Sequence, residues 1–235
     1  MTSFQIECAN MVIEIQCSHD GIRRRCAKYL THADRSDIVV APNDGHIRTA
    51  KKFMPHDSAE EVEFAAILCA LHEKLLERTA CTMHAAVISV DGAGYAFAAQ
   101  SGVGKTTHIR LWKKHFGERC TIVNGDKPIL SFQNEKVYAG GSPWCGKEGY
   151  SENGTVPLRG ICFLERAQTP SIRKLSDNEI IDRLFYQLSV PEPSTGLTLQ
   201  CLKIANMLIR YVPFYLLQCD ISDEAVKIAY EEMSK

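Results

Sequence analysis

The segment AQSGVGKTT, residues 99–107, constrains this chain more than any other part of its sequence. It matches most of the pattern G-x-x-x-x-G-K-[ST], in which glycines let backbone N–H groups converge on an anion. An apolar run precedes the segment and a helical pattern follows it, so the helix N-terminus would add positive potential. The segment therefore predicts a strand, a phosphate-binding loop and a helix. The alternative is a coincidental glycine turn, which would arise in about one chain of this length in a hundred.

Within this loop, each residue type has an expected role in holding a nucleoside triphosphate. Lys105 supplies a cation for the β- and γ-phosphates, and the Thr106 hydroxyl can complete the shell of Mg²⁺. Ala99 stands where the pattern has its first glycine, which requires a negative φ at that position. The expected nucleotide-binding residues are Ser101, Gly102, Val103, Gly104, Lys105, Thr106 and Thr107.

The length of 235 residues suits one α/β domain with a small lobe attached. Residues 1–57 contain short β-like runs, clearest at 11–15 and 38–40, and predict a small β-rich lobe. Ser58 and Glu61 form a capping-box pattern that opens a helix ending near Arg78. We therefore expect residues 58–235 to form the nucleotide-binding catalytic domain.

Downstream of this helix, two β-like runs around Asp91-Gly92 predict a hairpin that leads directly into the glycine loop. Further strands and helices follow in the pattern of a mixed α/β domain. The other expected strands are 121–123, 129–132, 136–138, 160–165 and 214–219, and the other expected helices are 106–115, one capped by Ser176, 197–211 and one starting at Ser222.

Composition excludes several classes of partner and compartment. With 27 basic and 28 acidic side chains the formal net charge is -1, so we expect no nucleic-acid or membrane partner. No window offers about 18 consecutive apolar residues, and the start lacks the pattern of a secretory leader. The ten cysteines include no C-x-x-C pair, and several lie within apolar runs, which favours a reduced, cytoplasmic protein.

The order of motifs from residue 83 to residue 166 resembles the catalytic domain of the HPr kinase/phosphorylase family and its distant relative, ATP-dependent phosphoenolpyruvate carboxykinase. The likeness includes a histidine, a hairpin, the glycine loop, a strand that ends in an acid, and a strand that begins with Arg-Gly. The matching positions here are His84, Val87-Ile88, Gly92, Gly94, Phe97, residues 101–106, 123–127 and 159–164.

This resemblance implies an α/β fold of the HPr kinase C-terminal and carboxykinase type, with a mixed sheet and a phosphate-binding loop. It also implies ATP and Mg²⁺ as cofactors. Asp126 matches the second family aspartate and would hold Mg²⁺ with Thr106; the alternative is an ordinary turn aspartate. Gly125 stands in place of the first family aspartate, the presumed base. Either Asp126 combines both roles, or His84 or Glu148 supplies the base, or phosphoryl transfer is weak or absent.

Two further roles follow from the resemblance. His84 matches the histidine beside the catalytic acid, with a satisfied core histidine as the alternative. Arg159 would neutralise charge on the transferred phosphoryl group, with a surface arginine at a strand start as the alternative.

The glycine-rich loop 141–149 gathers an aromatic ring, a cation and an acid after the strand that carries Asp126. Its position fits a loop that covers the substrate. We expect Trp144 to pack on a substrate or nucleotide and Lys147 to contact phosphate, with Glu148 as a further residue of this substrate loop. The alternative is a structural loop with a buried tryptophan.

Together these features predict a kinase that transfers the γ-phosphate of ATP to a hydroxyl, with Asp126, His84, Lys105 and Arg159 as catalytic residues. The first expected acceptor is serine in a protein or peptide, and the second is a small-molecule hydroxyl. A non-catalytic ATP-binding regulatory module is the alternative from another class. Carboxykinase activity is less favoured because this chain is much shorter. Family members are often oligomeric, so a homo-oligomer is also expected.

Overall fold

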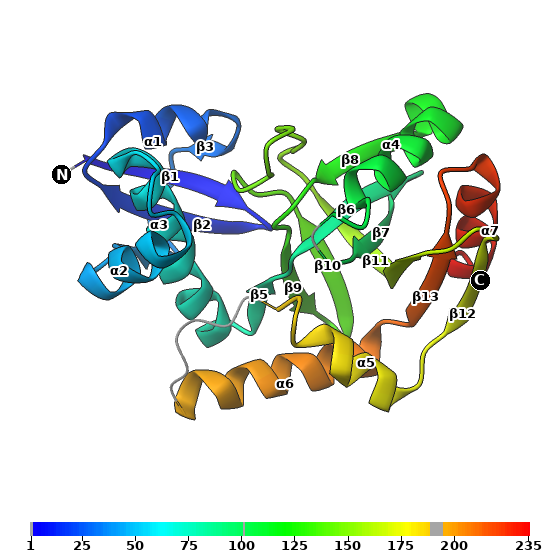
Figure 1. The fold of residues 1–235 in the computed structure, drawn as a ribbon. Helices are drawn as coiled ribbons and strands as arrows, with labels where there is room; N and C mark the ends of the chain where they lie inside the picture. The colour runs from blue at the N-terminus through cyan, green and yellow to red at the C-terminus, as the bar shows by residue number, and fades with distance from the viewer. Residues whose placement is uncertain (1, 101, 189–194) are drawn as a thin grey trace.

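The computed structural model describes residues 2–100, 102–188 and 195–235. Within these ranges the chain forms two sheets, one of four strands and one of nine. The smaller sheet has the strand order β3-β1-β2-β4, and β1 and β2 form an antiparallel hairpin at the left of Figure 1. Its strands are β1 (Thr2–Cys8), β2 (Met11–Cys17), β3 (Leu30–Thr31) and β4 (Ile38–Val40).

The N-terminal segment is richer in helix than the sequence analysis expected. It contains α1 (Asp20–Arg25), a 3₁₀ turn at Ala27–Tyr29 and α2 (Asp44–Phe53). The β-rich description of this lobe was therefore incomplete. The start of α2 is a capping box in which Asn43 pairs with His46. The sequence Asn-Asp-Gly-His resembles a turn, because the usual Glu or Gln at the third helical position is absent.

Helix α3 (Ala59–Glu77) starts at the predicted capping box between Ser58 and Glu61. One side of α3 packs on the four-stranded sheet through Ile67, Leu71 and Leu75. This shared core also takes in Trp144 from the second half of the chain. The division of the chain at residue 57 stays a prediction.

The larger sheet is mixed, as the fold class predicted. Its main path is β5-β9-β10-β11-β7-β6-β8, and β13 pairs with both β11 and β12. Strands β7, β11 and β13 are parallel to one another, and the other pairs in this sheet are antiparallel. The strands are β5 (Ala80–Thr82), β6 (Ala85–Val90), β7 (Ala93–Ala98), β8 (Cys120–Asn124), β9 (Ile129–Gln133), β10 (Lys136–Gly140), β11 (Thr155–Arg166), β12 (Ser171–Lys174) and β13 (Phe214–Cys219).

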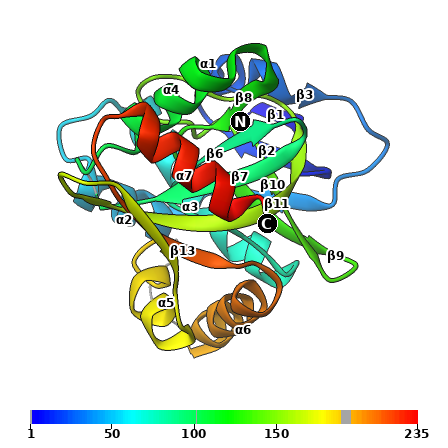
Figure 2. The same cartoon turned by 90° about the vertical axis from the view of Figure 1, so that its right-hand side faces the viewer.

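Helices cover both faces of this sheet (Figures 1 and 2). Helices α4 (Lys105–Phe116) and α7 (Asp223–Met233) lie on one face, and α5 (Asp177–Leu184) and α6 (Thr195–Tyr211) on the other. A 3₁₀ turn at Gly117–Arg119 joins α4 to β8. Among the described residues, no helix combines the length and apolar character that a membrane span requires.

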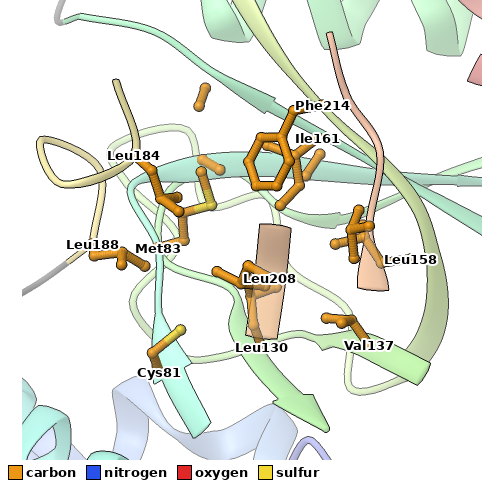
Figure 3. Packing of buried hydrophobic residues seen from close by; sticks show 14 of the residues in the cluster. Cys81, Met83, Leu130, Val137, Leu158, Ile161, Leu184, Leu188, Leu208 and Phe214 are labelled. Atoms are coloured by element: carbon orange, nitrogen blue, oxygen red, sulfur yellow. The ribbon is translucent and has the colours of Figure 1, made fainter. Parts of the chain in front are cut away.

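Side chains alternate in direction along the central strands, which explains why helices cover both faces of the larger sheet. On β11, Ile161 and Phe163 enter the core beneath α5 and α6, whereas Cys162 and Leu164 enter the core beneath α4 and α7. Side chains of a strand alternate between faces, so a strand that is apolar throughout must be buried on both. Figure 3 shows the first of these cores, in which Ile161 lies beside Phe214. The carboxyl ends of β7, β11 and β13 therefore form a rigid edge beside the glycine loop.

Candidate functional site

The glycine loop connects β7 to α4, and its backbone depends on two glycines. Gly102 has φ 81° and Gly104 has φ 121°, conformations that L side chains rarely adopt. A Cβ at either glycine would meet nothing within 4 Å, so backbone geometry rather than crowding requires them. Ala99 stands where the sequence pattern has a glycine, so it must have a negative φ. It is not among the described residues with positive φ, and this requirement is met. Ser101 lies outside the described residues.

The N-terminus of α4 has the properties of an anion site. Gly104 is the N-cap and supplies no side chain to bond the first-turn N–H groups of α4. The helix dipole and these N–H groups favour an anion at this point. Thr106 and Thr107 lie in this first turn, half-buried and exposed respectively.

The ammonium group of Lys105 is held at the base of the loop. Its Nζ lies 2.9 Å from Nε2 of His84 and 3.4 Å from the carbonyl oxygen of Ala99. Burial lowers the pKa of Lys105, and the nearby carboxylate of Asp126 opposes that shift. A partly desolvated cation next to such a loop interacts strongly with any phosphate that enters it.

Asp126 completes a line of polar groups with Lys105 and His84. Its Oδ1 is 3.2 Å from Nε2 of His84 and its Oδ2 is 3.0 Å from Nζ of Lys127. Burial raises the pKa of Asp126, but the His84 hydrogen bond and the Lys127 ammonium outweigh it and lower the pKa to about 2. The carboxyl group is therefore ionised near neutral pH, as a metal ligand must be.

One nitrogen atom of His84 faces both charges. Nε2 lies within hydrogen-bonding distance of the Lys105 ammonium and of the Asp126 carboxylate. When unprotonated it accepts from Lys105, and when protonated it donates to Asp126, but it does not do both at once. The structure thus brings together three residues that the sequence assigned to catalysis, and places a proton-carrying group between two of them.

Asn124 is a site residue that the sequence analysis missed. Its Oδ1 accepts hydrogen bonds from the backbone N–H groups of Asp126 and Lys127, both at 2.8 Å. Its Nδ2 donates to the carbonyl oxygen of Ser142 at 3.0 Å, and the residue is fully buried. The Asn-Gly-Asp sequence is a signal for this kind of turn, because asparagine side chains bond their own backbone two residues on. Asn124 therefore fixes the turn that aims Asp126.

Gly125 lies where neighbouring backbone approaches closely. A Cβ at this position would be 2.9 Å from the carbonyl oxygen of Cys145, and its N–H donates to the carbonyl oxygen of Tyr150 at 2.9 Å. An aspartate here would require loop 141–149 to move. This explains in physical terms why the site carries a single carboxylate on this turn.

The expectation that Trp144 packs on a ligand was wrong. Trp144 is only 6% exposed, stacks on Phe64 of α3 with ring centroids 5.1 Å apart, and donates its indole N–H to the Phe64 carbonyl at 3.0 Å. All its bonding capacity is used inside the core. Lys147 and Glu148 are exposed in the turn of the same loop, and Gly146 lies against Asp126. Trp144 anchors this loop, and only the turn remains available to a ligand.

Arg159 does not belong to the site. It is exposed near the start of β11, where Leu158 and Gly160 pair with Gly94 and Tyr95 at the start of β7. The glycine loop follows the opposite end of β7, roughly 15 Å away at about 3.3 Å per residue. The assignment of Arg159 to catalysis was wrong because the register of the two parallel strands places it at the far edge.

The arginine beside the loop is Arg166, at the carboxyl end of β11. Its Nε donates to the carbonyl oxygen of Val103 at 3.1 Å and its Nη2 donates to that of Gly102 at 2.5 Å. A planar guanidinium that bonds two successive carbonyls fixes their orientation. The sequence feature that points to Arg166 is its position at the end of a buried strand. That strand is parallel to β7, the strand that precedes the loop.

Two pockets flank the loop on opposite faces of the sheet. The first, of about 380 Å³, lies on the α4 side and is lined by Thr107, Leu111, Leu164 and Ile221 among others. The second, of about 400 Å³, lies on the α5 side. Val103 and Arg166 line both pockets. The loop is therefore positioned between two cavities of the size that small ligands occupy.

The described residues of the site carry the kinds of ligand atom that bind Mg²⁺ together with a nucleotide. Among them, no group of three or more His, Cys, Asp or Glu side chains is arranged to hold a metal. Mg²⁺ in phosphate sites is usually bound through one or two protein oxygens and the phosphates themselves. Thr106 and Asp126 are the residues that would hold it, and the metal would neutralise phosphate charge.

Comparison with known proteins does not assign this chain to a family. No family model matches the sequence, and neither does any curated protein. Among solved structures, the Hpr(Ser) kinase/phosphatase from Coxiella burnetii is similar with a TM-score of 0.37 and 14% sequence identity; the overlap covers 66% of this chain and 99% of that chain.

Proposed function

We propose that this protein is an ATP- and Mg²⁺-dependent kinase that transfers a terminal phosphoryl group to a hydroxyl. The observation that carries the proposal is the line formed by Lys105, His84 and Asp126 at the base of a loop with open, positive-φ glycines. A half-buried cation, a proton carrier and an ionised carboxylate at a helix N-terminus match the needs of phosphoryl transfer, which depends on positioning and charge neutralisation.

The nucleotide has a natural orientation in this site. Its phosphates would lie on the N-terminus of α4, with Lys105 at the terminal phosphate. The base and ribose would then occupy the pocket on the α4 side, where Leu111 and Ile221 supply apolar surface. Ile221 is 77% exposed, so a base that covered it would remove apolar area from water.

In the proposed reaction the acceptor oxygen attacks the terminal phosphorus, and the bond from that phosphorus to the bridging oxygen of ADP breaks. The hydroxyl proton passes to Asp126 or to Nε2 of His84 and then to solvent. The products are a phosphomonoester, ADP and one proton. Asp126 is a weak base because its pKa is lowered to about 2. The loose transition state makes strong base catalysis unnecessary.

Serine in a protein or peptide and a small-molecule hydroxyl are the two acceptor classes we propose to test. A second function, an ATP-binding regulatory module without chemistry, is favoured by one observation. The position that would carry a second carboxylate is Gly125, where the Cys145 carbonyl leaves no room for a side chain. Such a module would bind nucleotide at the same loop.

The decisive experiment compares Lys105→Ala with Lys114→Ala, an exposed lysine on the same helix. Calorimetry measures binding of Mg²⁺ with a non-hydrolysable ATP analogue, and radiolabelled ATP measures phosphoryl transfer. We expect Lys105→Ala to lower transfer by about a hundredfold or more, and Lys114→Ala to leave it unchanged. Binding without transfer by the wild-type chain would indicate the regulatory module. Absence of binding for every magnesium-loaded triphosphate would remove both.

A further inference from the structure

Lys127 is a cation of the site to which the reaction described above assigns no role. Its Nζ lies 3.0 Å from Oδ2 of Asp126, and 20% of its side chain is exposed. Its backbone N–H donates to Oδ1 of Asn124 at 2.8 Å and to the Trp144 carbonyl at 3.1 Å. Its carbonyl oxygen accepts from the Ser142 hydroxyl at 2.6 Å. The backbone is therefore fixed, while the flexible four-carbon side chain lets the ammonium group move over a short distance.

The charge of Lys127 acts on groups at both sides of the site. Burial is the main cause of the lowered pKa of Lys105, and the charge of Lys127 lowers that pKa further. Burial likewise lowers the pKa of His72 on α3, and Lys127 adds to this shift. Two ammonium groups, those of Lys105 and Lys127, thus flank the single carboxylate of Asp126. Their surplus of positive charge favours a polyanion over a bare metal ion.

Both oxygens of the Asp126 carboxylate already have a partner. Oδ1 faces Nε2 of His84 at 3.2 Å, and Oδ2 faces Nζ of Lys127 at 3.0 Å. Asp126 can hold Mg²⁺ only if one of these two partners gives up its oxygen. Lys127 is the partner more easily displaced, because Nε2 of His84 also lies 2.9 Å from the ammonium group of Lys105.

A displaced ammonium group needs another acceptor close to the carboxylate. The terminal phosphate of a magnesium-bound nucleotide supplies one, because the metal is shared between the phosphate oxygens and the protein. A hydrogen bond from an ammonium group to a phosphate oxygen is charge-assisted and replaces the one lost from Asp126. Lys127 would then neutralise the phosphate from the side opposite to Lys105.

We propose that Lys127 is a catalytic residue that exchanges partners when the nucleotide binds: its ammonium group leaves Asp126 and contacts the terminal phosphate. The inference rests on the kinase function proposed above. Lys127 forms no covalent bond and transfers no proton; it neutralises the charge that spreads over the phosphoryl oxygens in the transition state. The role that the sequence analysis assigned to Arg159 is thereby filled from the turn that carries Asp126.

The test compares two nucleotides by calorimetry with the full chain, because ADP lacks the terminal phosphate. Lys127→Met removes the charge and keeps most of the length of the side chain. We expect it to bind the Mg²⁺ complex of a non-hydrolysable ATP analogue about tenfold or more weakly than wild type, and to bind Mg·ADP with unchanged affinity. In the assay with radiolabelled ATP, transfer should fall by about a hundredfold.

Two further variants connect the effect with the charge of Lys127. Lys127→Gln keeps a donor for Asp126 without the charge, and we expect the same selective loss of affinity for the ATP analogue. Lys136→Met, which alters an exposed lysine at the start of β10, is the matched control and leaves both affinities unchanged. Thermal melting of each variant verifies that it is folded.

A titration with Mn²⁺ alone tests the exchange itself. Mn²⁺ replaces Mg²⁺ at oxygen ligands and is detected by electron paramagnetic resonance. Without nucleotide, we expect Lys127→Met to bind Mn²⁺ about fivefold or more tightly than wild type, because Oδ2 of Asp126 has lost its ammonium partner. An unchanged or weaker affinity for Mn²⁺ overturns the exchange.

The outcomes also separate the role of Lys127 from the kinase function. If both charge-removing variants lose affinity for the ATP analogue and for ADP equally, or for neither, the role of Lys127 is overturned and the kinase function stands. If the loss is selective but the wild-type chain transfers no phosphate, the kinase function is overturned together with the catalytic role, and Lys127 is a binding residue only. If no magnesium-loaded triphosphate binds, both proposals are overturned.

Discussion

At the scale of single residues, Gly125 limits which side chains the site can contain. Its missing Cβ would lie 2.9 Å from the carbonyl oxygen of Cys145, a distance that real Cβ atoms do not adopt. We expect Gly125→Ala to lower the free energy of unfolding by about 1–3 kcal/mol, because backbone must shift to accept the methyl group. Urea denaturation measures this change.

Gly154 provides the matched control for Gly125. A Cβ at Gly154 would meet nothing within 4 Å, and its φ is not positive, so Gly154→Ala is expected to stay within about 0.5 kcal/mol of wild type. Gly125→Asp is expected to lose stability in the same way and to gain no phosphoryl-transfer activity. Equal stability of the two alanine variants, or a rate increase in Gly125→Asp, would contradict this account of the site.

Two buried histidines make stability depend on pH. Burial lowers the pKa of His108 to about 4, and burial together with the charge of Lys127 lowers that of His72 to about 3. In the unfolded chain both titrate near 6.5, so between pH 6.5 and 4 the unfolded state binds more protons. The free energy of unfolding therefore decreases as the pH is lowered, by about 1 kcal/mol for each histidine between pH 6.5 and pH 5.5.

Removal of one histidine tests this dependence. We expect His72→Met to reduce the slope of unfolding free energy against pH in this window by about half, because one of two proton-binding groups is gone. His32→Gln, which alters an exposed histidine, is expected to leave the slope unchanged. Chemical denaturation at several pH values gives both slopes, and identical slopes for wild type and His72→Met would refute the assignment.

At the scale of elements, strand β11 carries an arginine near each end, and only the one at its carboxyl end touches the loop. We expect Arg166→Ala to weaken binding of Mg·ATP about tenfold or more, because two loop carbonyls lose a charged donor. Arg159→Ala is the control from the other end and should leave the affinity unchanged. Calorimetry with both variants decides which end of the strand belongs to the site.

The two arginines also show what sequence alone can and cannot provide. Local signals predicted the strand, the hairpin before the glycine loop and the capping boxes at Ser58 and Ser176, all of which are present. Local signals do not contain the register between β7 and β11, which is fixed by packing between residues far apart in sequence. The choice between Arg159 and Arg166 depends on that register alone.

Loop 141–149 is held beside Asp126 by helix α3, and the segment that follows the loop is held by the N-terminal segment. Trp144 stacks on Phe64, and Tyr29 donates to the Glu152 carbonyl at 3.3 Å. We expect Trp144→Phe to lower the free energy of unfolding by about 1–3 kcal/mol, since the Phe64 carbonyl loses its buried donor. Hydrogen exchange of residues 141–149 should speed up with it. An unchanged exchange rate would show that Trp144 does not anchor the loop.

At the scale of the whole molecule, the least predictable feature was how the N-terminal segment joins the rest. The sequence placed a boundary near residue 57, where β-like runs give way to a capped helix. The structure places residues of α3 and Trp144 in one core with the four-stranded sheet. No periodicity in residues 1–57 could reveal this, because the apolar face of a small sheet does not specify which helix will cover it.

This shared core predicts that residues 58–235 do not fold stably alone. Without the four-stranded sheet, Ile67 and Leu71 on α3 and the ring of Trp144 would be exposed to water. Each fully buried large apolar side chain contributes about 1.5–3 kcal/mol. Exposure of three would therefore remove a large part of the free energy of unfolding of a typical domain. We expect the 58–235 fragment to bind a hydrophobic dye and to melt without a cooperative transition, and expect addition of the 1–57 fragment to restore the transition. A fragment 58–235 that melted cooperatively at the temperature of the full chain would mean that the boundary separates two independent domains, and that Asp126 is positioned without help from the N-terminal sheet.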